Sequence, residues 1–203
     1  MFLLATFVGS LESHHVIKYA YDAAWLKIFY HNSAGSVYFS SRSEALYTIG
    51  TKKYSILNKL NASFKVDGVY EFLLEYPEKT GYNRWRQAKL PMNNPEVTGK
   101  TAEGYTPIHI DWDGMYWGGL VLSSNTNTLL DGSSGTTHFW YSIGETSNSY
   151  KPNFPGPATV VNQCYLWIRV DGSNFDYPRI TKSRTWSRMT NPLLILHLLC
   201  ITN

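Results

Sequence analysis

Short runs of alternating apolar and polar side chains recur along the chain. Residues 24–30, 69–77, 108–111 and 161–170 follow this pattern, and the last run sets Leu166 and Ile168 opposite Tyr165 and Trp167. A period of two places successive side chains on opposite faces of a β-strand. Turn residues separate the runs, and no βα alternation recurs. The pattern therefore predicts an all-β fold, an antiparallel β-sandwich of jelly-roll type.

Two segments depart from the strand pattern. Apolar side chains at roughly helical spacing predict one short helix near residues 54–64. Ser41 and Glu44 have the spacing of a capping box, which predicts a helical turn through Leu46. The apolar positions in the first segment are Tyr54, Leu57, Leu60 and Phe64.

The composition adds one anomaly, an excess of aromatic residues. The 203 residues include seven Trp, fifteen Tyr and nine Phe, many beside Gly, Ser, Thr or Asn. Hydrophobic residues make up 43% of the chain, which is enough for a sizeable core. Lysines and arginines are mostly scattered and the net charge is only +3, so we expect no nucleic-acid partner. Aromatic rings beside amides and hydroxyls also suit the recognition of sugars.

The two ends of the chain differ from its middle. Residues 1–12 begin with the apolar run Phe2 to Val8, which fits either a signal peptide or an N-terminal strand. Residues 13–171 carry the strand pattern and are the predicted sandwich domain. Residues 172–203 have no clear period and read as an irregular extension. Their apolar segment, Leu193 to Ile201, is too short to span a bilayer. A secreted or cell-surface location is the expectation that follows from a signal peptide.

A dense group of planar and amide side chains marks the first candidate site. Asn83, Arg84 and Trp85 follow one another, flanked by Tyr82 and Gln87. An arginine of this group can stack on an aromatic face or bind a carboxylate of a ligand. The alternative is that Trp85 anchors a loop in the core and Arg84 pairs with a glutamate such as Glu75. We predict Asn83, Arg84 and Trp85 as ligand-binding residues.

The segment IHIDWDGMYWGGL holds the second candidate site. Trp112 and Trp117 complete the predicted ligand-binding set, although strand parity makes Trp112 the first candidate for a core position. Asp111 and Asp113 alternate before Gly114 as calcium ligands do in a loop. The alternative is a hairpin turn with Asp-Gly at its tip. We expect no cofactor, with calcium bound by Asp111 and Asp113 as the alternative.

Enzyme chemistry has weaker support. Glycoside hydrolysis needs two carboxylates that flank a cleft, and Glu71 and Glu75 share a predicted strand face. Asp111 and Asp113 are further candidates, but nothing in the sequence ties any of these across strands. A serine-nucleophile elbow is absent from the sequence. We predict no catalytic residue, and a solvated strand face is the preferred interpretation of Glu71 and Glu75.

Several short sequence motifs resemble those of a known family. FLLEYP, GYNRWRQ and WGGL follow in that order, and an aromatic strand ending in IG comes later. This order resembles a β-rich domain of mostly uncharacterised proteins from protists of the trichomonad kind, over about Trp25 to Val170. A looser likeness to discoidin and lectin-type sandwiches is one of fold alone. The resemblance implies a β-rich globular unit and no established catalytic residue.

These observations together predict a non-enzymatic carbohydrate- or ligand-binding module, exported or surface-associated, whose partner is a glycan or an extracellular protein. The alternatives are a glycoside hydrolase-like enzyme on a lectin-type sandwich, and a structural interaction domain with no small-molecule site. An exposed set of rings at loop ends would carry the binding function.

Overall fold

The computed structural model divides into two compact units, Met1–Gly172 and Ser173–Asn203. The described residues all lie in the first unit. They are residues 3–6, 16–112, 117–132, 141–147 and 160–171.

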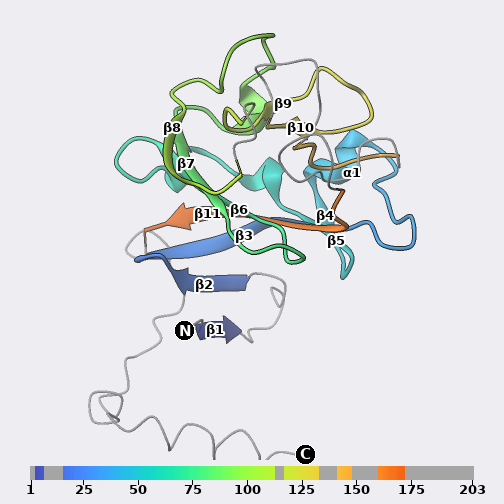
Figure 1. Ribbon diagram of the computed structural model, residues 1–203, viewed down its shortest axis with the longest axis horizontal. Helices are drawn as coiled ribbons and strands as arrows, with labels where there is room; N and C mark the ends of the chain where they lie inside the picture. The colour runs from blue at the N-terminus through green and yellow to red at the C-terminus, as the bar shows by residue number, and fades with distance from the viewer. Residues whose placement is uncertain (1–2, 7–15, 113–116, 133–140, 148–159, 172–203) are drawn as a thin grey trace, which may run out of the picture. The chain divides into compact units, whose positions relative to one another are not determined.

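One large antiparallel sheet organises the first unit (Figure 1). Its strands lie in the order β1-β2-β3-β11-β6-β7-β8, and β5, paired with β4, is attached to β3. A second, two-stranded sheet pairs β9 with β10. The strands are β1 (Leu3–Thr6), β2 (Val16–Ala20), β3 (Ala23–Asn32), β4 (Thr48–Ile49), β5 (Lys53–Ser55), β6 (Tyr70–Glu75), β7 (Asn83–Gln87), β8 (Thr106–Ile110), β9 (Val121–Leu122), β10 (Leu130–Asp131) and β11 (Gln163–Val170).

The predicted all-β, antiparallel class is confirmed. The alternating runs at 24–30, 69–77, 108–111 and 161–170 coincide with β3, β6, β8 and β11. The jelly-roll connectivity remains a prediction. The N-terminal segment, for which the sequence left a signal peptide and a strand open, contains β1, and β1 pairs with β2.

The short helix lies earlier than predicted. Residues 54–64 are not an α-helix: β5 comes first, and two 3-10 helices follow, η1 (Leu57–Lys59) and η2 (Ala62–Phe64). Pairing of Tyr54 with Tyr30 of β3 holds the start of this segment extended, so tertiary contacts outweigh the helical spacing. The α-helix α1 (Arg42–Leu46) begins at the predicted cap, where Ser41 Oγ accepts a hydrogen bond from the Glu44 backbone N–H at 3.2 Å. A third 3-10 helix, η3 (Pro91–Asn93), follows β7.

The two faces of the large sheet carry different side chains. We call the core face the one with Phe29, Leu166, Phe72 and Trp85, all fully buried. Phe72 and Trp85 are cross-strand neighbours, and their rings stack 5.5 Å apart. A layer formed by α1, β9, β10 and their loops packs on this face (Figure 1). Burial of each large ring contributes about 1.5–3 kcal/mol.

The opposite face we call the pocket face. It carries Lys27, Trp167, Leu73 and Arg84 in one row across β3, β11, β6 and β7. A β-bulge between Leu166 and Trp167 shifts the register against β3. Side chains on this face are only partly covered, and a small cluster of Trp25, Leu73 and Trp167 is buried at its centre.

Candidate functional site

The three predicted tryptophans lie in the core rather than at a surface. Trp85 is fully buried, and Trp112 and Trp117 are 4% and 7% exposed. The Trp117 ring meets Trp85 edge-on at 4.7 Å and packs so closely on Gly132 that an added Cβ there would lie 2.4 Å from it. The expectation that these rings meet a ligand at the surface is therefore wrong, whereas the core position of Trp112 was predicted from strand parity.

Asn83 has a structural task in the same core. Its Nδ2 donates to the Trp112 carbonyl at 2.8 Å, and its Oδ1 accepts from the Trp112 backbone N–H at 2.9 Å. Tyr141 Oη donates to the same carbonyl at 2.8 Å. A buried amide that satisfies a backbone donor and acceptor fixes the exit of the chain from β8. Asn83 is therefore not available to a ligand.

Arg84 points to the pocket face, but it pairs with Glu71 and not with Glu75. Arg84 Nη2 lies 2.6 Å from Glu71 Oε1, and Arg86 Nε and Arg169 Nη1 lie 2.9 and 3.0 Å from Glu71 Oε2. The Glu71 side chain is 1% exposed, so it is not on a solvated strand face. Three guanidiniums thus surround one carboxylate.

This cluster fixes the protonation of Glu71. Burial acts to raise its pKa, but the hydrogen bonds from Arg84, Arg86 and Arg169 outweigh burial and hold the pKa below its ordinary value. Glu71 is therefore an ionised, fully engaged group. It is poorly suited to act as the proton donor of an acid pair.

Asp111 organises a corner beside the pocket face. Its Oδ2 accepts from the Tyr82 backbone N–H at 2.8 Å, and its Oδ1 lies 3.0 Å from His109 Nε2. Gly81 has a φ of 101°, and a Cβ there would lie 2.7 Å from Asp111 Oδ2. Only glycine fits this turn, so Asp111 and Gly81 together set the position of the Tyr82 ring.

Calcium binding remains a prediction. Asp113 lies outside the described residues. Among the residues that are described, no group of three or more His, Cys, Asp or Glu side chains is arranged to hold a metal ion.

The pocket face contains a pocket of about 660 Å³, a size typical of small-molecule sites. Cross-strand pairing builds its floor, because Tyr165 lies between Tyr30 and Glu75 while Trp167 lies beside Lys27. Tyr30 and Tyr165 stack at 4.6 Å. The other described lining residues come from β2, the β2–β3 turn and the loop after β6: Lys18, Tyr21, Tyr76, Pro77, Lys79, Thr80 and Gly81.

An unusual turn supplies one wall of the pocket. Tyr21 and Asp22, between β2 and β3, have φ values of 52° and 60°, in the left-handed region that side chains with a Cβ rarely adopt. The Tyr21 ring packs on Tyr82 at 4.0 Å, and Arg84 Nη1 donates to the Tyr21 carbonyl at 3.0 Å. Trp25 Nε1 donates to the Ala20 carbonyl at 2.9 Å. These contacts hold Tyr21 over the sheet in a strained conformation, a feature common at functional sites.

The polar groups of the pocket are few. Lys18 Nζ lies 2.5 Å from Glu75 Oε2 and 4.3 Å from the centre of the Trp167 ring. Burial, followed by the charge of Glu75, raises the pKa of Tyr21 to about 12, so its phenol stays a hydrogen-bond donor at neutral pH. Trp167 is 5% exposed, and its Nε1 has no hydrogen-bond partner in the described part of the chain.

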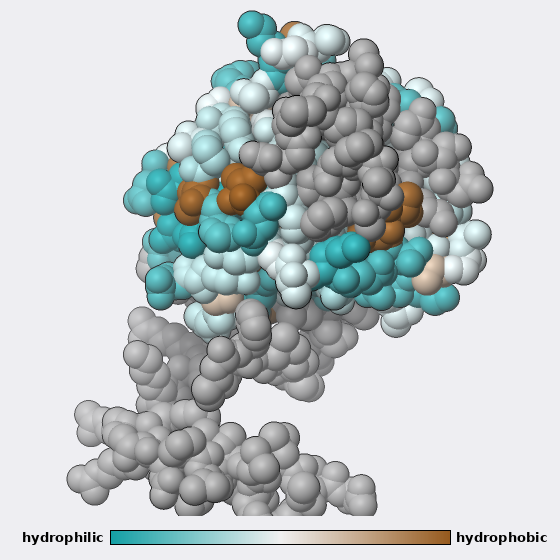
Figure 2. All heavy atoms as spheres, viewed as in Figure 1, coloured by the Kyte–Doolittle hydropathy of each residue, from teal (hydrophilic) through white to brown (hydrophobic). Residues whose placement is uncertain are grey.

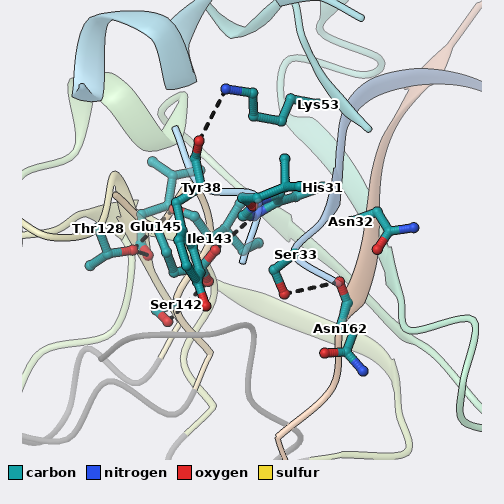
Figure 3. A network of polar contacts seen from close by, with 12 residues as sticks. His31, Asn32, Ser33, Tyr38, Lys53, Thr128, Ser142, Ile143, Glu145 and Asn162 are labelled. Carbon is teal, nitrogen blue, oxygen red and sulfur yellow. Dashed lines mark hydrogen bonds and ion pairs between the residues drawn. The ribbon is translucent and has the colours of Figure 1, made fainter. Parts of the chain in front are cut away.

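A second polar network is entirely internal (Figure 3). His31 Nδ1 lies 2.8 Å from Glu145 Oε2, and Ser142 Oγ donates to Glu145 Oε1 at 3.2 Å. Both His31 and Glu145 are fully buried. Burial raises the pKa of Glu145, although the hydrogen bond from His31 opposes this. The Ser142 hydroxyl donates to the Glu145 carboxylate and not to the His31 imidazole. The histidine therefore does not activate this serine as a nucleophile, and we assign the network a role in stability.

The sequence pattern missed most of the pocket. It placed Tyr165 and Trp167 on one strand face but gave no sign that this face, and not the one with Trp85, is left partly open. Lys18, Lys27 and Tyr21 stood out by no motif. The one signal in the sequence was the period-two alternation of residues 161–170, which places Tyr165 and Trp167 on the same strand face.

Comparisons with protein-family models, curated proteins and solved structures find no match for this chain. The resemblance to protist proteins therefore remains a prediction.

Within the described residues, no helix has the length and apolar character needed to cross a membrane. Where Figure 2 colours the described residues, the surface runs from hydrophilic to neutral, with small and separate hydrophobic patches.

Proposed function

We propose that this chain is a non-enzymatic binding module for carbohydrate and that the pocket beside Tyr21, Tyr165 and Trp167 is its site. The observation that carries the proposal is a pocket of about 660 Å³ lined by aromatic side chains, of which Tyr21 and Tyr165 are partly exposed. We keep an exported or cell-surface location as part of the proposal.

The chemistry of the wall suits a sugar. A flat ring covers the apolar C–H face of a pyranose, and the half-buried Tyr165 ring offers such a surface, supported by the buried Trp167 ring 5.8 Å away. The Tyr21 phenol is a donor, and Glu75 is an acceptor, for hydroxyl groups at the rim of such a sugar.

A hydrolase on the same pocket has less support. Glycoside hydrolysis uses two carboxyl groups on either side of the bond. Glu75 is the carboxylate among the described lining residues, and Glu71 is held by three arginines. An arrangement with one carboxylate favours retention of the ligand over its cleavage.

The proposal is tested by titrating the full chain with methyl glucoside, methyl galactoside, N-acetylglucosamine and cellobiose. We expect at least one to shift the indole N–H resonance that is assigned to Trp167 by its loss in Trp167→Phe. Tyr165→Ala should weaken this sugar about tenfold, which is 1.4 kcal/mol. Tyr47→Ala removes a 45% exposed ring outside the pocket and is the control. If none of these sugars, nor their acidic derivatives, moves the Trp167 signal, the carbohydrate proposal is wrong.

A further inference from the structure

The charges around the pocket are unequal. Its described lining residues include three lysines, Lys18, Lys27 and Lys79, and one glutamate, Glu75. Lys18 and Glu75 neutralise each other at 2.5 Å. Lys27 has no carboxylate within 4 Å among the described residues, and its recorded contact is the Tyr54 ring, 4.9 Å from Nζ. The pocket thus contains a cation without an anionic partner.

Lys27 lies where its charge can act on a ligand that enters the pocket. Lys27 lies directly opposite Trp167 across β3 and β11, and it lines the pocket together with Tyr165. The side chain is half-buried, and burial lowers the pKa of Lys27 below its ordinary value. A desolvated ammonium is stabilised when an anion enters beside it, and the interaction is stronger there than in open water.

We propose that the ligand of this pocket is an acidic sugar, with its anionic group on Lys27 and its ring against Tyr165. The inference rests on the proposed carbohydrate function and specifies the class of sugar. An ammonium is a point charge, so it accepts either a carboxylate or a sulfate ester. Lys27 is then a specificity-determining residue, whereas the rings bind neutral and acidic sugars alike.

The experiment compares three ligands by calorimetry with the full chain: methyl glucoside, methyl glucuronide and glucose 6-sulfate. We expect at least one acidic sugar to bind about tenfold more tightly than the glucoside. Which acidic sugar is preferred distinguishes a carboxylate from a sulfate as the natural group. Raising the salt concentration to about 0.5 M should reduce this preference and leave the affinity for the glucoside unchanged.

Variants of Lys27 test whether this residue causes the preference for acidic sugars. Lys27→Met should abolish the preference while the glucoside still binds, and Lys27→Arg should retain it because the charge stays. Lys65→Met is a matched control, since Lys65 is also half-buried and lies 5.2 Å from a tyrosine ring, that of Tyr70, outside the pocket. Equal affinity for neutral and acidic sugars overturns the inference but not the carbohydrate function. An equal loss of both in Lys27→Met also overturns it, because Lys27 would then only support the pocket. Failure of all three sugars overturns the inference, whereas the carbohydrate function is overturned only if methyl galactoside, N-acetylglucosamine and cellobiose also fail to bind.

Discussion

The two faces of the large sheet use the same kind of residue in opposite ways. On the core face, Trp85 and Phe72 are fully covered by the layer of α1, β9 and β10, and their rings contact only protein. On the pocket face, Tyr165 is half-buried and lines an open pocket. Aromatic content alone therefore does not locate a binding surface. What distinguishes the faces is the layer that covers one of them.

The two faces of the large sheet also differ in their charged side chains. The pocket face holds two clusters on neighbouring strands: the arginines around Glu71, and the lysines of the pocket beside Glu75. The core face holds the buried His31–Glu145 pair, which is closed off from solvent. If this contrast is right, substitutions on the core face should change stability, and those around the pocket should change binding.

Trp85→Ala should produce the largest effect. Removing a fully buried indole leaves a cavity against Phe72 and Trp117, and we expect a loss of about 3–5 kcal/mol in the free energy of unfolding. Urea denaturation followed by circular dichroism measures it. Trp85→Phe should lose less, because a ring remains. A loss below about 1 kcal/mol would show that this face is not the principal core.

Glu71→Gln should come next. It removes the carboxylate from three arginines whose side chains are 17%, 40% and 26% exposed. We expect a loss of about 2–3 kcal/mol, less than for a fully buried pair because water reaches the guanidiniums.

Salt and a surface pair provide the controls for Glu71. Because anions screen exposed like charges, added salt should recover part of the loss in Glu71→Gln. Glu103→Gln breaks an exposed pair with Lys89 and should stay within about 0.5 kcal/mol. A Glu71→Gln variant as stable as the parent would mean that the cluster is not structural.

The sequence predicted the strands far better than the faces. Alternation located β3, β6 and β11, and the cap at Ser41 located α1. Strict alternation failed within β3, where Lys27 and Tyr30 share the pocket face although they are three residues apart. The extra residue Ile28 of β3, opposite the step from Leu166 to Trp167 of β11, shifts the register, and such a bulge depends on the pairing of two distant segments.

The candidate site was harder to predict for physical reasons. The residues Asn83, Trp85, Trp112 and Trp117 are polar or aromatic in a way that suits either a site or a core, and only the covering layer decides between them. The wall at Tyr21 depends on a left-handed turn that Tyr-Asp does not signal, since Asn-Gly is the usual sequence for such a turn. Contacts with Tyr82 and Arg84 impose it from far along the chain.

Acid should weaken the layer that covers the core face. The hydrogen bond from Lys53, 2.6 Å away, lowers the pKa of Glu44 from 4.5 to about 2. A lowered folded-state pKa adds stability above the ordinary pKa of the carboxyl, and this stability is lost as the pH falls from about 4.5 to about 2.

The Glu44→Gln variant isolates this contribution. We expect the variant to be about 1–2 kcal/mol less stable than the parent near neutral pH, a value reduced by solvent access to the pair. The difference should shrink as the pH falls and approach zero below about pH 2, where Glu44 is protonated in the parent and both proteins carry a neutral side chain. Urea denaturation at a series of pH values measures it. A difference that persists unchanged at the acid limit would assign the loss to packing rather than to charge.

Tyr165→Ala should have a small effect on stability, close to that of the surface control, and a clear effect on binding. The ring loses its stacking on Tyr30 at 4.6 Å, an interaction of about 0.5–1.5 kcal/mol, and it leaves no closed cavity because the pocket already lies above it. We therefore expect the loss of stability to be a fraction of that in Trp85→Ala, measured under the same denaturation conditions. Sugar affinity should respond in the opposite order, with the larger loss in Tyr165→Ala. If Tyr165→Ala destabilises the chain as much as Trp85→Ala does, the ring serves a second core, and the distinction between a covered face and a binding face no longer holds.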